Sequence, residues 1–205
     1  MDHRYLLLMR FMLVNIVAVA LGSAAWAQGW LAGLSDPLTS KLSLGIAIVF
    51  TYGLIVCGLK IWQTSTAIND LKEGGKPAAA RVVQFVSDKK RSSTESRNIQ
   101  LGTLRLKMSH DIQVVRNVAN LLVFLGLIGT VIGFIISLSG VEPQSVSQSE
   151  RVAGMVATLI QGMSIALYTT LLGAVLNVWL NINYRILSTG TVSLYSRIVE
   201  YGESR

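Results

Sequence analysis

Two apolar stretches of this chain read Leu125-Gly126-Leu127-Ile128-Gly129-Thr130-Val131-Ile132-Gly133 and Ala166-Leu167-Tyr168-Thr169-Thr170-Leu171-Leu172-Gly173, and they decide its fold. Each lies in an apolar run long enough to cross a hydrocarbon core, which takes about 20 helical residues. Small and hydroxyl residues recur in both at helical spacing. Such a pattern indicates a seam where a second helix packs or where something polar passes.

The composition places the chain among integral membrane proteins. Of its 205 residues, 51% are hydrophobic and 14% are charged, whereas soluble domains contain about 25% charged residues. A single cysteine, Cys57, excludes a disulfide framework, and the two histidines form no cluster with it, so no metal or other cofactor is expected. The sequence contains no nucleophile–base set and no phosphate loop, so we do not expect an enzyme.

Four apolar runs have the length of membrane spans. They cover Phe11–Leu31, Leu42–Trp62, Val118–Leu138 and Met155–Leu180. The two short turns hold only Lys41 and Arg151, but the long segment that joins the second and third spans, taken from Lys60 to Arg116, holds Lys60, Lys72, Lys76, Arg81, Lys89, Lys90, Arg91, Arg97, Arg105, Lys107 and Arg116. Cytoplasmic segments carry the excess of Lys and Arg. The sequence therefore predicts a multi-pass protein of the cell inner membrane with both termini cytoplasmic. The excess of basic residues behind the net charge of +7 is therefore expected on the cytoplasmic side. We expect no nucleic-acid partner.

The first span has a competing interpretation as a signal peptide. Its apolar run ends in Ala25-Trp26-Ala27, which resembles a cleavage site, and cleavage after Ala27 would leave three spans. The run is longer than a typical signal core, and Trp26 and Trp30 are typical of an interfacial belt. We expect an uncleaved span and keep cleavage as the alternative.

The polar segments predict helices that continue beyond the membrane. A breaker, Gly74-Gly75-Lys76-Pro77, divides the long segment. After it, one apolar helix face leads into span three through Leu101, Leu104, Met108, Ile112, Val115 and Ala119. Span four continues in the same way through Leu187, Thr191, Leu194, Ile198 and Tyr201. The basic run Lys89-Lys90-Arg91 is either a solvated or lipid-facing patch or a docking site for a partner.

We therefore expect an all-α integral membrane protein with four transmembrane helices, of which the third and fourth extend into the cytoplasm. Its expected parts are an N-terminal transmembrane hairpin (1–62), a cytoplasmic helical segment (63–117), a pore-lining helix pair (118–184) and a cytoplasmic C-terminal helix (185–205).

Polar and small residues form a stripe on each helix of the predicted pair. On span three they are Gly126, Thr130, Gly133, Ser137 and Gly140, and Gly129 with Gly133 forms a GxxxG pair that lets helices approach closely. On span four, Thr170, Gly173, Asn177, Asn181 and Tyr184 share a face. Threonine hydroxyls can bond within their own helix, but the amides need other partners. Spans two, three and four contain no Asp, Glu, Lys or Arg in their cores. Because ion pathways usually need an ionisable group, any such group must come from another chain.

At these residues the chain resembles the MotA/TolQ/ExbB proton channel family. The resemblance includes Leu125 to Gly133, Gly162 to Gly173 and Tyr184, and four spans are more similar to the MotA branch than to the three-span TolQ and ExbB branch. It implies a pentamer in the lipid bilayer around a dimeric, single-span MotB/TolR/ExbD-like partner that carries a membrane aspartate. Proton flow, or sodium flow in some members, past that aspartate would drive rotation.

The resemblance also implies roles for individual residues. The family's pore threonines correspond to Thr130 and to Thr170 rather than Thr169, and Gly126, Gly129, Gly133 and Gly173 would pack the helices. Ser137, Asn177, Asn181 and Tyr184 would be polar residues lining the pore. Two departures are that Trp179 replaces a usual proline and that the long loop is shorter than in flagellar stators. The alternative function is a non-conducting membrane scaffold in which the small residues only hold helices together.

Overall fold

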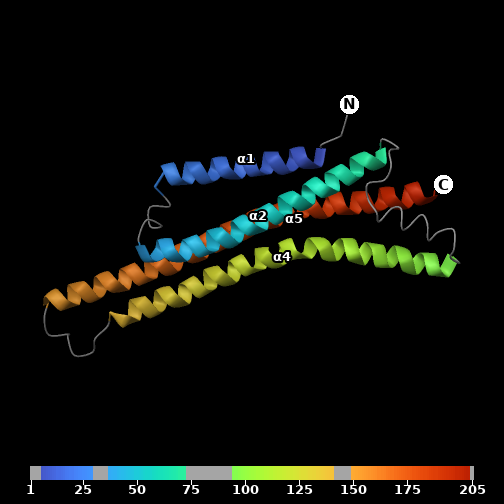
Figure 1. Cartoon of the computed structure of the whole chain (residues 1–205). Helices are drawn as coiled ribbons and strands as arrows, with labels where there is room; N and C mark the ends of the chain where they lie inside the picture. The colour runs from blue at the N-terminus through green and yellow to red at the C-terminus, as the bar shows by residue number, and fades with distance from the viewer. Residues whose placement is uncertain (1–5, 30–36, 73–93, 141–148, 204–205) are drawn as a thin grey trace. The chain divides into compact units, whose positions relative to one another are not determined.

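The structure, a computed structural model, is helical throughout the part of the chain that it describes, residues 6–29, 37–72, 94–140 and 149–203. Its elements are α1 (Leu6–Ala27), α2 (Pro37–Lys72), α4 (Thr94–Ser139) and α5 (Ser149–Glu203) (Figure 1). All four are long and apolar enough to cross a membrane. The predicted fold class, an all-α protein with four membrane-spanning helices, is confirmed.

The ends of the first two helices follow from their local residues. The sequence predicted a first span reaching Leu31, but α1 ends at Ala27. Gly29 has a φ of 75°, a left-handed conformation that glycine adopts without strain, and its N–H donates to the carbonyl of Trp26 at 3.0 Å. Pro37 opens α2, where its missing N–H costs no helical bond.

The third and fourth helices continue well past a single membrane crossing, as predicted. At 1.5 Å per residue, the 46 residues of α4 and the 55 of α5 are each more than twice as long as a hydrocarbon core of about 30 Å. The predicted apolar faces are buried at Met108, Ile112, Val115, Leu187 and Ile198. The cytoplasmic position of these extensions stays a prediction. The breaker at residues 74–77 and the basic run at residues 89–91 lie outside the described residues.

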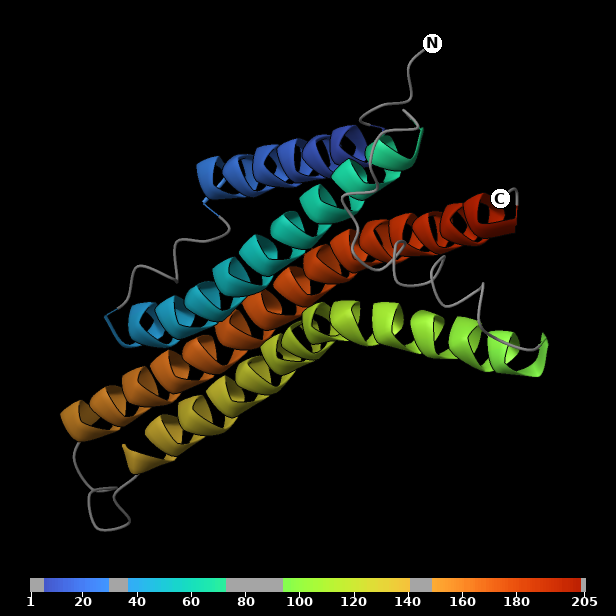
Figure 2. The same ribbon diagram turned by 45° about the vertical axis from the view of Figure 1, so that its right-hand side comes forward.

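The helices contribute to two compact units. One contains residues 17–53 and 117–180, and the other contains residues 1–16, 54–116 and 181–205. In the first, α4 and α5 lie side by side and antiparallel, as Figures 1 and 2 show. There α2 packs on both: a Cβ added to Gly53 would meet Leu180 and Val118, and the Phe50 and Trp179 rings lie 5.1 Å apart. The four-part division predicted from the sequence is not tested by these units.

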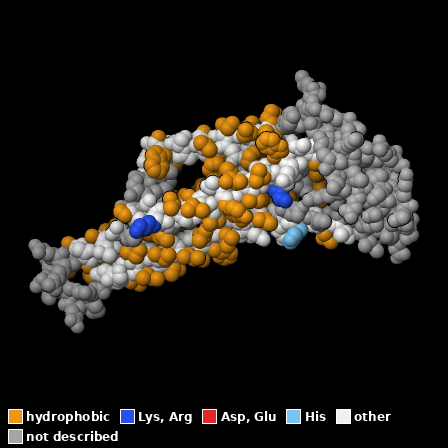
Figure 3. All heavy atoms as spheres, viewed as in Figure 1, with side chains coloured by type: hydrophobic (Ala, Val, Ile, Leu, Met, Phe, Trp, Pro, Cys, Tyr) orange, Lys and Arg blue, Asp and Glu red, His pale blue; other side chains and the backbone are white. Residues whose placement is uncertain are grey.

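On the face that Figure 3 shows, hydrophobic side chains are spread along the described helices. Phe124 on α4 is 60% exposed and Leu167 on α5 is 70% exposed. A soluble protein rarely exposes so much contiguous apolar surface. This surface fits a lipid environment or the faces of neighbouring membrane helices.

Candidate functional site

The α4–α5 seam is closely packed along its length. Its α4 side consists of Gly126, Gly129, Gly133, Ser137 and Gly140, and its α5 side consists of Thr158, Gly162, Ala166, Thr169 and Gly173. Each successive contact moves three or four residues forward on α4 and three or four residues back on α5. This is the pattern of one continuous antiparallel contact.

Glycine is required in the seam because backbone meets backbone. A Cβ added to Gly133 would lie 2.6 Å from both the Ala166 nitrogen and the Gly162 carbonyl oxygen. A Cβ on Gly173 would lie 2.6 Å from the Leu122 carbonyl oxygen and 3.0 Å from Gly126 Cα. Backbone atoms cannot turn away as a side chain can, so any larger residue must separate the helices. The four predicted packing glycines, Gly126, Gly129, Gly133 and Gly173, therefore all lie in this seam.

Three polar side chains bond across the seam to backbone carbonyls. Ser137 Oγ donates to the Leu159 carbonyl at 3.0 Å, Thr170 Oγ1 to Gly126 at 3.2 Å, and Asn177 Nδ2 to Ala119 at 2.6 Å. Interhelical hydrogen bonds of this kind supplement close packing in a membrane. Ser137 and Asn177, predicted as pore-lining polar residues, thus also connect the two helices.

The adjacent threonines of α5 have different environments. Thr169 is fully buried against Gly129, and its hydroxyl donates to the Ile165 and Ala166 carbonyls of its own helix. Thr170 is exposed beside the seam. On α4, Thr130 is partly buried, and its hydroxyl donates to the Leu127 carbonyl at 2.6 Å. The Thr130 and Thr170 side chains can therefore contact lipid or another helix beside the seam, whereas the buried Thr169 side chain cannot.

The two accessible threonines flank the seam on the same side. Neighbouring residues on a helix are turned by about 100°. Thr130 follows the seam residue Gly129, and Thr170 follows the seam residue Thr169. Because the helices are antiparallel and face each other, one forward step on each emerges on the same flank. This arrangement creates a pair of hydroxyls along one edge of the helix pair.

The remaining predicted pore residues lie on the part of α5 that belongs to the other unit. Asn181 and Tyr184 are both partly buried. Their roles as pore residues stay predictions.

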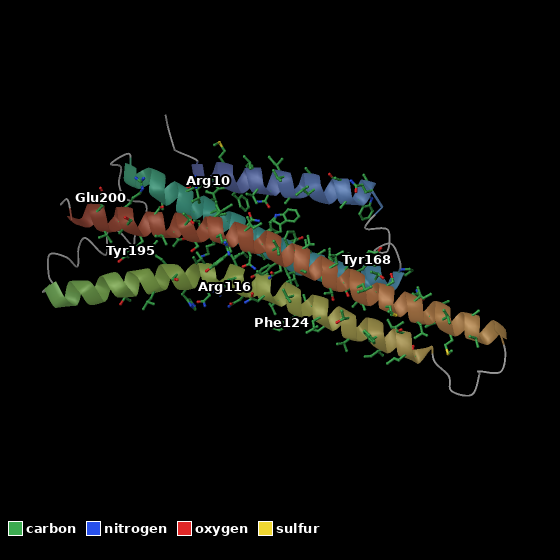
Figure 4. All side chains as sticks on the ribbon, turned by 180° about the vertical axis from the view of Figure 1, so that it is seen from behind. Arg10, Arg116, Phe124, Tyr168, Tyr195 and Glu200 are labelled. Atoms are coloured by element: carbon green, nitrogen blue, oxygen red, sulfur yellow. The ribbon has the colours of Figure 1, made fainter. Side chains whose placement is uncertain are left out.

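The helix segments that form the site carry no charged side chain. Residues 117–139 of α4 and 152–184 of α5 contain no Asp, Glu, Lys or Arg. Within the described residues, no group of three or more His, Cys, Asp or Glu lies close enough to hold a metal. A hollow of about 410 Å³ follows α5 and is lined by Ile160, Met163, Ser164, Leu167, Tyr168 and Leu171 (Tyr168 is labelled in Figure 4). Its lining has no ionisable group apart from the phenol of Tyr168.

The sequence analysis missed several seam residues. Gly162 and Ala166 form the α5 side together with Thr169, and none of the three was assigned to helix packing. Their signal was present in the sequence, since residues 162, 166, 169 and 173 are all small or hydroxyl residues at four- and three-residue steps. Asn15 and Asn183 were also missed, although each is an amide among mostly apolar neighbours.

Comparison with protein-family models assigns the segment that contains α4 and α5 to a known family. Residues 72–199 match the MotA/TolQ/ExbB proton channel family, and this segment includes all of α4 and nearly all of α5. Comparisons with curated proteins and with solved structures found no match. The match covers more than half of the chain and confirms the resemblance noted from the sequence. The chain therefore belongs to the MotA/TolQ/ExbB proton channel family, as a multi-pass membrane subunit of the proton-channel type.

Proposed function

We propose that the chain forms a ring, a pentamer as in its family, around a single-span MotB/TolR/ExbD-like partner and couples proton flow to rotation or force. The single observation that carries this proposal is the paired hydroxyls of Thr130 and Thr170 on one flank of a seam without membrane charges. A proton path needs a group that titrates. The aspartate of the partner would be that group.

The proposed role of the threonines follows from the chemistry of a carboxyl group in a membrane. Removal from water raises the pKa of a carboxyl, and hydrogen bonds to its charged form lower it again. Thr130 and Thr170 would donate such bonds as the partner's carboxyl takes a proton from one side and releases it to the other. Each charge that crosses 100 mV supplies about 2.3 kcal/mol, so a few protons can drive a mechanical step.

The contacts of Thr170 support its choice over Thr169. The Thr169 hydroxyl is sealed in the seam, where its two bonds go to its own helix. The Thr170 hydroxyl lies at the edge and bonds to the Gly126 carbonyl at a moderate 3.2 Å. A hydroxyl in this position can exchange that bond for one to a carboxyl group.

Proton uptake into vesicles tests the proposal. The chain is reconstituted with a candidate partner, a one-span protein that carries a membrane aspartate, and a trapped pH dye reports flux under an imposed potential. We expect flux only with both proteins, a loss of at least tenfold in Thr170→Val, and recovery in Thr170→Ser, which keeps a hydroxyl. The subunit ratio is measured by mass spectrometry of the same complex.

Thr51 provides the matched control. It is exposed on α2, in the same unit, and its hydroxyl bonds to its own helix at Ala47. Thr51→Val makes the same chemical change without altering the seam, so flux should be unchanged. Equal flux in Thr170→Val and in the unmodified protein would refute the assignment. So would an assembly in which lipid covers both Thr130 and Thr170.

A non-conducting scaffold is the second candidate, and the Thr170 bond to Gly126 is the observation that favours it. In a scaffold that hydroxyl only joins helices. Thr170→Val would then weaken assembly by the loss of one hydrogen bond. The unmodified protein would show no partner-dependent flux. Measuring flux and assembly on one preparation separates the two functions.

A further inference from the structure

An amide pair joins α1 to α5 within the unit formed by residues 1–16, 54–116 and 181–205. Asn15 Nδ2 donates to Asn183 Oδ1 at 2.9 Å and to the Phe11 carbonyl of its own helix at 2.8 Å. The Asn183 side chain is fully buried, although both residues lie in helices apolar enough to span a membrane. A buried amide is costly in hydrocarbon unless it is hydrogen-bonded. The pair therefore favours one alignment of the two helices.

Two apolar contacts extend this junction along one face of α1. Leu7, Phe11 and Asn15 follow at four-residue steps, so they share a face. The Leu7 side chain lies against Gly190 of α5, where an added Cβ would be 2.9 Å from its Cδ2. The Phe11 ring lies against Gly58 of α2, 3.6 Å from the position of an added Cβ. Glycine on α2 and on α5 thus leaves room for a large side chain of α1.

Most other side chains of α1 are exposed. No residue in its most apolar window is buried, and Val19, Leu21 and Trp26 are 59%, 68% and 63% exposed. In addition, α1 lies outside residues 72–199, which match the family model, whereas Asn183 and Gly190 lie inside them. The contacts of Leu7 with Gly190 and of Asn15 with Asn183 therefore tie α1 to the family segment, and Phe11 adds a contact to α2.

We infer that Asn15 and Asn183 form a polar latch that holds α1 on α5 and α2 as a resident fourth membrane helix. The latch sets the rotation of α1, because only the face that carries Asn15 also presents Leu7 and Phe11 to the two glycines. This inference concerns the attachment of α1 and does not depend on proton conduction. It also disfavours loss of α1 by cleavage after Ala27, because cleavage would remove a bonding partner of a buried amide.

Cross-linking in native membranes tests the latch in the full chain. Leu7→Cys and Gly190→Cys form a reporter pair on the same face, eight residues from Asn15, with Cys57→Ala removing the one native thiol. A short thiol-reactive cross-linker joins the pair, and mass spectrometry of the linked peptides measures the rate. An interhelical hydrogen bond in a membrane changes an equilibrium constant by roughly three- to eighteen-fold. The cross-linking rate follows the fraction of α1 that is docked, so we expect Asn15→Leu to lower the rate by up to that factor.

Further variants make the test decisive. Asn183→Leu should lower the rate to a similar extent, and the double variant should lower it little further, because either change removes the same bond. Asn120→Leu is the matched control: Asn120 is exposed on α4, outside the junction, and its replacement should leave the rate unchanged. If Asn183→Leu fails to fold, Asn15→Leu still decides, since Asn15 is only partly buried. An unchanged rate in Asn15→Leu, or an intact mass without residues 1–27, would overturn the inference.

Discussion

The α4–α5 seam and the α1–α5 junction hold helices together by different means. In the seam, Gly126, Gly133 and Gly173 bring backbones into contact, and hydroxyl or amide side chains bond to carbonyls of the facing helix. In the α1 junction, side chains meet: one amide pair, a leucine and a phenylalanine ring. Side chains can adjust and backbones cannot. The comparison predicts that the seam tolerates substitution poorly and that the α1 junction loses stability by smaller amounts.

The largest effect is expected at Gly133. Its leucine variant would force a side chain into backbone atoms of Ala166 and Gly162, so the helices must separate. Overpacking of a rigid core lowers the free energy of unfolding by about 1–3 kcal/mol. We expect the Gly133 variant at the upper end of this range, because the added side chain would meet backbone atoms. Unfolding by SDS titration from mild detergent measures the loss. Gly45→Leu is the control, because nothing lies within 4 Å of a Cβ added there. Equal stability of the two variants would show that the seam is not closely packed.

A graded effect separates backbone contacts from side-chain contacts. A Cβ on Gly53 would meet the tips of Leu180 and Val118, at 2.7 and 2.8 Å, and these tips can rotate. Gly53→Ala should therefore remain within about 1 kcal/mol of the unmodified protein, helped by the better helix propensity of alanine. Gly133→Ala should lose more in the same titration. The reverse order would contradict the distinction between the two kinds of contact.

The latch should contribute a modest coupling energy. A double-mutant cycle of Asn15→Leu and Asn183→Leu isolates the bond between them, and such bonds average about 0.6 kcal/mol in membranes, with a maximum near 1.7. The cycle is measured by the same unfolding titration. A coupling energy of zero would mean that the amides meet without stabilising α1.

The smallest effect on stability is expected at Thr170, where the consequence for function is large. Thr170→Val removes one bond to the Gly126 carbonyl, worth about 0.6 kcal/mol, and leaves the glycine contacts unchanged. Stability should change little while partner-dependent proton flux falls at least tenfold. A loss of stability as large as that of Gly133→Leu would instead place Thr170 among the packing residues of the seam.

The sequence by itself determined the class of protein, four membrane-spanning helices and the family. These follow from apolar length, charge content and the spacing of glycines and hydroxyls, which are local properties of the chain. Helix periodicity also predicted the buried faces at Met108, Ile112 and Val115 and at Leu187 and Ile198. The sequence predicted a first span that reaches Leu31, beyond the end of α1 at Ala27. The helix ends earlier because Gly29 adopts a left-handed conformation, which the apolar pattern does not show.

Only the tertiary structure decided which side of each helix faces a neighbour. Thr169 and Thr170 are adjacent, and their different environments depend on how α5 is rotated against Gly129 and Gly126. The same reason explains why Asn15 and Asn183 were missed. They are 168 residues apart in the chain, and no local pattern in either helix shows that the two amides meet. Rotation and pairing of helices are set by the summed packing of all their contacts, so they belong to the fold as a whole.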